Sequence, residues 1–82
     1  MEALKGGDEF VGQIIRKFNE TTLHIWALDH KVAFPAYGVD ASAWRIDELV
    51  VCRLDATASV IRKIERADAS IETQYARKKF HG

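Results

Sequence analysis

The residues of this chain that could carry out chemistry are few and scattered. His24, Asp29 and His30 lie close together in the sequence and are all possible metal ligands. A metal site needs several ligands that converge on one point. His24 falls within a predicted strand and His30 within the turn after it, so their spacing does not imply convergence. We therefore expect no metal site and no bound cofactor.

Cys52 is the one cysteine of the chain, and beside a histidine it could act as a nucleophile. It follows Val50 and Val51 in an apolar segment, where a cysteine usually serves as a small core residue. The adjacent carboxylates of Asp47 and Glu48 would point to opposite faces of a strand, so they cannot form an acid/base pair. The sequence predicts a protein that is not an enzyme.

Aromatic and basic side chains offer a second kind of chemistry, the binding of a partner. Trp26 and Tyr37 can stand on the same face of a predicted sheet, with Trp44 in the loop that follows. Such residues anchor protein partners or stack on nucleic-acid bases. The alternative is that the C-terminal helix, whose apolar side includes Ile71 and Tyr75, covers these aromatic residues.

A short basic segment, Arg77, Lys78 and Lys79, lies near the C-terminal end. Its charges could contact phosphate groups or an acidic surface. Cations at the end of a helix also compensate the helix dipole, which is the simpler interpretation.

Three segments of strand length lie in the N-terminal half of the chain. They are rich in aromatic and β-branched side chains, and turn-forming residues separate them: Phe10–Phe18, Thr22–Leu28 and Lys31–Tyr37. Side chains alternate between the two faces of a strand, so Phe10, Ile14 and Phe18 are expected on one apolar face.

The third strand is predicted to lie at an edge of the sheet, because Pro35 cannot donate a ladder hydrogen bond. A fourth strand is predicted within Ile46–Leu54. Beyond Leu54 the apolar residues recur at spacings of three and four, which is typical of one face of a helix. They are Val60, Ile64, Ala67, Ile71 and Tyr75.

These patterns predict one α+β domain over residues 1–82. Residues 1–8 are expected to be flexible, residues 9–54 to be β-rich and residues 55–80 to be helical. In this fold, an antiparallel sheet of about four strands is covered by a C-terminal helix or helix pair.

The alternative is a small five-stranded barrel, in which Ser59–Arg66 forms a fifth strand instead of a helix. Gly12-Gln13-Ile14, followed by Thr22-Leu23-His24-Ile25, resembles the opening hairpin of oligonucleotide-binding barrels. The resemblance covers only this hairpin. It implies a nucleic-acid-binding barrel that uses exposed aromatic residues and the basic C-terminal end.

If Thr57–Lys79 forms one continuous helix, the length of that helix favours self-association. A continuous helix over Thr57–Lys79 would be about 34 Å long at ~1.5 Å per residue, whereas a short strand spans roughly 20 Å. The helix would extend past its own sheet and could contact a second copy. The chain has 12 basic and 12 acidic residues, and a net charge of zero also favours association over repulsion.

The sequence has no apolar run of membrane-spanning length and no signal segment, and its single cysteine excludes an internal disulfide. We therefore expect a cytoplasmic setting and no membrane partner. The predicted function is a small non-enzymatic interaction module, most simply a homodimer formed through the sheet face and the C-terminal helix. A protein partner is a further possibility, and nucleic-acid binding is the alternative function.

Overall fold

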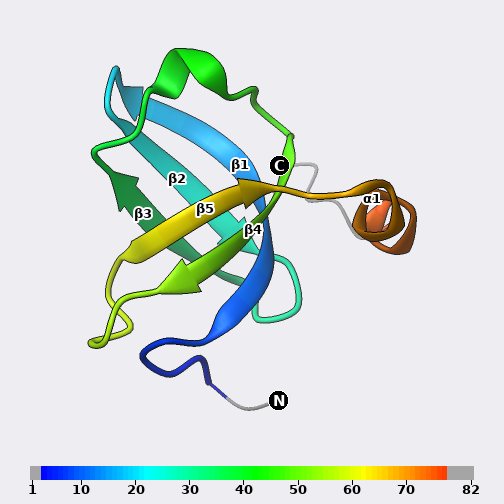
Figure 1. Cartoon of the computed structure of the whole chain (residues 1–82), viewed down its shortest axis with the longest axis horizontal. Coiled ribbons are helices and arrows are strands. Elements are labelled where there is room, and N and C mark those ends of the chain that lie inside the picture. Colours follow the sequence, from blue (N-terminus) through cyan, green and yellow to red (C-terminus); the bar gives the residue numbers. More distant parts are fainter. Residues whose placement is uncertain (1–2, 78–82) are drawn as a thin grey trace.

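The computed structural model of the chain describes residues 3–77, which form a closed five-stranded β-barrel followed by one short α-helix (Figure 1). The elements are β1 (Glu9–Asn19), β2 (Thr22–Ala27), β3 (Val32–Tyr37), the 3₁₀ helix η1 (Ala41–Ala43), β4 (Leu49–Leu54), β5 (Ile61–Arg66) and α1 (Ala69–Tyr75). Around the barrel the order is β1-β2-β3-β5-β4, and β4 pairs with β1 to close it. Neighbouring strands are antiparallel except β3 and β5, which are parallel.

The long strand β1 closes the barrel because it pairs with β2 along one edge and β4 along the other. Gly12 lies opposite Ala27 in the first ladder and opposite Val50 in the second. A Cβ atom at Gly12 would lie 2.4 Å from Cγ2 of Ile25, which no real side chain tolerates. Glycine at this position therefore lets β1 bend closely over the core.

A β-bulge in β1 changes which side chains face the core. Ile14 pairs with Ile25, but the next pair is Arg16 with His24, so Ile15 is an extra residue in β1. An extra residue reverses the alternation beyond it. A second irregularity, between Lys17 and Asn19, leaves Phe18 itself without a partner in β2. Phe18 is 56% exposed, so the prediction that it shares the buried face of Phe10 and Ile14 is wrong.

The barrel interior is filled by alternate residues of the strands together with Ala41 from η1. The buried members of this core are Phe10, Ile14, Leu23, Ile25, Ala27, Ala36, Ala41, Val50, Cys52, Leu54 and Ile61. The first three predicted strands are confirmed, and the fourth is confirmed over Leu49–Leu54. Residues 28–31 join β2 to β3, so this turn is longer than the two residues that the sequence indicated.

The principal fold prediction is wrong for residues 61–66, which form the strand β5 instead of a helix. The barrel is the alternative fold of the sequence analysis. Leu54 pairs with Ile61 while Arg53 pairs with Lys63, so Arg62 is an extra residue in β5. The inward-facing residues Ile61 and Ile64 are therefore three positions apart, which removes the two-residue period of a strand. The predicted helical face instead included Val60, which precedes β5.

The helix α1 covers part of the outer surface of the barrel. It begins after Asp68, whose Oδ1 accepts a hydrogen bond of 2.9 Å from the backbone N–H of Ile71. Ile71 and Tyr75 pack against a second apolar cluster that includes Leu28 and Leu49. Because α1 has only seven residues, the prediction of a helix that extends beyond its own sheet is wrong.

Within residues 3–77 there is no helix of the length and apolar character needed to cross a membrane.

We expect Gly12→Ala to lower the free energy of unfolding by about 1–3 kcal/mol, because the added methyl group overpacks the core against Ile25. Urea unfolding followed by tryptophan fluorescence measures this loss. In an Ile25→Ala background the contact with Cγ2 is removed and only 3.2 Å contacts with Phe10 Cε2 and the Trp26 carbonyl oxygen remain, so Gly12→Ala should cost less. An equal cost in both backgrounds would contradict the proposed close approach of β1 to β2.

Candidate functional site

Exposed aromatic side chains gather on the outer surface of β1, β2 and β3. We call this surface the aromatic face, and its members are Arg16, Phe18, His24, Pro35 and Tyr37. Large apolar side chains are seldom left in water without a reason when they lie together. The aromatic face is therefore the candidate functional site.

The centre of the aromatic face is a stack of two rings. The rings of Phe18 and His24 are 5.5 Å apart between centroids and only 12° from parallel. The guanidinium carbon of Arg16 lies 5.4 Å from the centroid of the Phe18 ring. Arg16 is also the cross-strand partner of His24. The bulge at Ile15 turns Arg16 outward, and the second irregularity of this ladder, at Phe18, leaves the Phe18 ring beside His24.

Tyr37 extends the aromatic face onto β3. The ladder between β2 and β3 pairs His24 with Pro35 and Thr22 with Tyr37. The Tyr37 side chain is 62% exposed. A shallow hollow of about 270 Å³ lies beside it, lined by His24, Ala33, Phe34, Pro35 and Tyr37. The face thus presents a stacked pair of rings, a proline ring and a free-standing phenol around a depression.

Two carboxylates, Asp40 and Asp55, accept hydrogen bonds from residues of their own loops. The Asp40 carboxylate accepts hydrogen bonds from Oγ and N of Ser42, and these bonds, with a smaller effect of the Lys17 charge, lower its pKa. Asp55 in the β4–β5 loop accepts a 3.0 Å bond from the N–H of Ser59, which is the main reason that its pKa is lowered. Both carboxylates are therefore ionised at neutral pH.

The three aromatic residues predicted to form one patch lie in different places. Trp26 packs in the cluster beneath α1. Trp44 packs against the core, with the Arg66 guanidinium 4.3 Å above its ring. Only Tyr37 belongs to the aromatic face. Phe18 was missed, because a regular alternation from Phe10 and Ile14 would place it on the buried face.

The predicted C-terminal residues lie apart from the aromatic face. Ile71 and Tyr75 pack α1 onto the barrel beside Trp26, the one residue of the predicted aromatic patch that lies in this cluster. The Tyr75 hydroxyl donates to the Asp29 carboxylate, and this bond, with burial and the Asp29 charge, raises the pKa of Tyr75 to about 12. Arg77 is the last described residue, and Lys78 and Lys79 lie outside the described residues.

Another hollow, of about 690 Å³, lies between η1 and the turn before β4. Two cations line it, Arg45 and Arg66, and Nε of Arg66 lies 3.0 Å from Oε2 of Glu48. Another nitrogen of Arg66 donates to the Ala43 carbonyl. The Arg66 guanidinium is therefore already engaged by its own chain.

The possible nucleophile and metal ligands do not form a reactive site. Cys52 is buried in the core, as predicted, and burial raises the pKa of its thiol to about 12. His24 stacks on Phe18, whereas His30 lies in the turn between β2 and β3. Over residues 3–77, no cluster of three histidine, cysteine or acidic side chains could hold a metal ion.

Comparison with protein-family models, curated proteins and solved structures found no match for this chain. Its function is therefore argued from the aromatic face itself.

We expect the Cys52 thiol to react slowly with a disulfide reagent at pH 8, because the thiolate is disfavoured and the sulfur is buried. In urea, where the chain is unfolded, the same thiol should react at the rate of a free cysteine. Absorbance of the released thiolate measures both rates. Equal rates for the folded and unfolded chain would contradict the burial of Cys52.

Proposed function

We propose that this chain binds single-stranded nucleic acid on the aromatic face. The supporting observation is the exposed stack of Phe18 on β1 and His24 on β2, with Arg16 beside it. Tyr37 lies on the neighbouring strand β3. Every base has a π face, and stacking on an aromatic side chain contributes ~1–3 kcal/mol per base. Unpaired bases can reach such rings, whereas bases within a duplex are stacked on each other.

The barrel supports this proposal through the position of the site. Barrels of the oligonucleotide-binding type use the surface of their second and third strands for ligands. The aromatic face occupies that surface and includes the adjoining part of β1. The fold alone does not give the function, so the argument depends on the chemistry of the side chains.

The charges of the chain favour binding in which stacking contributes more than phosphate contacts. The net charge is zero, and the exposed cations near the aromatic face are Arg16, Lys17 and Arg62. Each phosphate contact with a single strand contributes about −0.7 to the slope of log affinity against log salt. We therefore propose modest affinity with a shallow salt dependence, and binding without catalysis.

We expect Phe18→Ala and Tyr37→Ala each to weaken binding of a fluorescent oligothymidylate by roughly 5- to 150-fold, the equivalent of ~1–3 kcal/mol of lost stacking. Fluorescence anisotropy at low salt measures the affinity. Both side chains are largely exposed, so circular dichroism should show folded variants.

The matched control is Ile46→Ala, which removes a similarly exposed apolar side chain that lies outside the aromatic face. This variant should bind as the unaltered chain does. If the unaltered chain binds no oligonucleotide at low salt, or if all three variants bind equally well, the proposal is wrong.

Self-association remains a prediction, but α1 no longer supports it. What supports it now is the exposure of Phe18 and Tyr37 on a chain of zero net charge. A homodimer formed through the aromatic face would hide both rings. It should therefore dissociate in Phe18→Ala and when oligonucleotide is added. Size-exclusion chromatography with light scattering tests this, and a monomer at every concentration would rule out the dimer.

A further inference from the structure

The contact between β3 and β5 is the weakest seam of the barrel. Along β2, every residue from Thr22 to Ala27 has a partner in β3. Between β3 and β5, a single pair, Ala36 with Ile61, joins the strands. Pro35, next to that pair, has no N–H and cannot donate to either neighbour. The barrel therefore closes here through few hydrogen bonds.

The residues that follow this pair on each strand are exposed. Ala36 and Ile61 face inward and are only 1% and 6% exposed. Tyr37 follows Ala36 at the end of β3, and Arg62 follows Ile61 near the start of β5, and both are exposed. An aromatic residue and a cation thus flank the one pair that joins the two strands.

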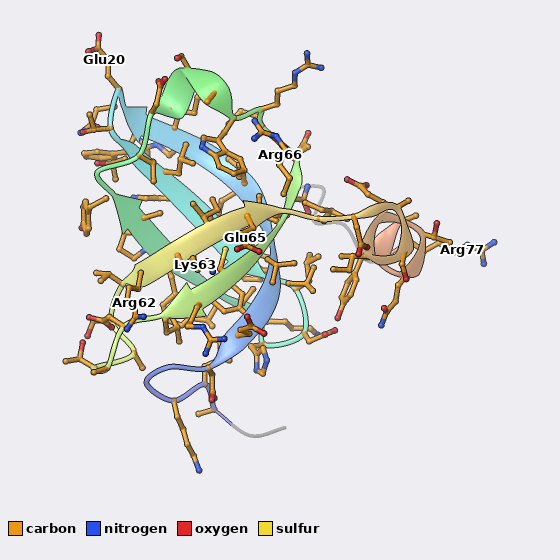
Figure 2. All side chains as sticks on the ribbon, in the orientation of Figure 1. Glu20, Arg62, Lys63, Glu65, Arg66 and Arg77 are labelled. Carbon is orange, nitrogen blue, oxygen red and sulfur yellow. The ribbon has the colours of Figure 1, made fainter. Side chains whose placement is uncertain are left out.

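Arg62 differs from the other cations of β5. Lys63 Nζ lies 3.0 Å from Oε1 of Glu65, and Arg66 pairs with Glu48. Within residues 3–77, Arg62 has no carboxylate within salt-bridge distance. Figure 2 shows Arg62 at the beginning of β5, away from the paired side chains of Lys63 and Glu65. Its guanidinium group is therefore available to a phosphate.

We propose that the bound strand of nucleic acid crosses this seam, with a base on Tyr37 and a phosphate on Arg62, and that binding holds the seam closed. This inference depends on the function proposed above. The strands lie in the order β1-β2-β3-β5, so the path runs from Arg16 and Phe18 across the barrel to Arg62. At ~4.7–4.9 Å between neighbouring strands, it covers roughly 15 Å.

A ligand that contacts both sides of the seam must be released before the seam can open. Amide groups that exchange with solvent through this local opening should then exchange more slowly in the complex. At a ligand concentration 100 times the dissociation constant, opening should become about 100-fold rarer. Protection by the ligand should therefore be concentrated in β3 and β5.

The experiment measures hydrogen exchange by mass spectrometry on the full chain, with and without oligothymidylate, together with the affinity of three variants. Arg62→Gln should weaken binding and lower the salt slope by about 0.7. It should also abolish the added protection in β5. Arg62→Lys, which keeps the charge, should restore most of the affinity. Lys63→Gln, the matched control, removes one cation from the same strand and should leave both measurements unchanged.

The outcomes separate this inference from the proposed function. Oligothymidylate binding that depends on Phe18 and Tyr37 but not on Arg62, with no added protection in β5, overturns the seam proposal alone. Equal losses in Arg62→Gln and Lys63→Gln also overturn it, because they indicate a general charge effect. The absence of any binding overturns both proposals.

Discussion

Two irregularities in the ladder of β1 with β2, at Ile15 and at Phe18, determine which side chains of β1 face the barrel interior. Before Ile15, Phe10, Gly12 and Ile14 face the interior, and the missing side chain of Gly12 lets β1 approach Ile25. After it, the alternation is reversed and Arg16 faces outward with His24. A regular ladder would have continued to direct the side chains of even-numbered residues inward. The second irregularity leaves Phe18 without a partner between Lys17 and Asn19, and its ring stacks on His24 at the outer surface.

The outer surface of this small barrel has two apolar areas, one covered by α1 and one exposed. The cluster of Trp26, Leu28 and Leu49 is covered by α1, which the Asp68 cap and the Tyr75–Asp29 hydrogen bond hold in place. The aromatic face has no such cover from the described residues, and Phe18 and Tyr37 remain more than half exposed. An exposed apolar area on a small protein often marks an interaction site. This contrast is the reason that we propose binding at the open area.

The sequence predicted β1, β2 and β3 because their apolar residues alternate and turn-forming residues separate them. Its two main errors have one physical origin. The irregularities at Ile15 and Phe18 place Phe18 outside, against the regular alternation. The extra residue Arg62 puts the inward-facing Ile61 and Ile64 three positions apart, so that β5 lacks the two-residue period of a strand. An extra residue changes a period of two locally to three, and a single sequence does not mark where this occurs. Tyr37 was predicted as a binding residue, but its actual neighbours depend on strand order, which local patterns do not contain.

The account depends most on the claim that the stacked rings of Phe18 and His24, together with Tyr37, receive the bases of a single strand. Nuclear magnetic resonance tests this directly, because a stacked base shifts the ring protons of the residue beneath it. In a titration with oligothymidylate, we expect the chemical shifts of the ring protons of these three residues to change in proportion to binding. The chemical shift of the indole N–H of Trp26, beneath α1, should not change. Unmoved ring signals, or shifts confined to Trp44 and the hollow beside η1, would contradict the account.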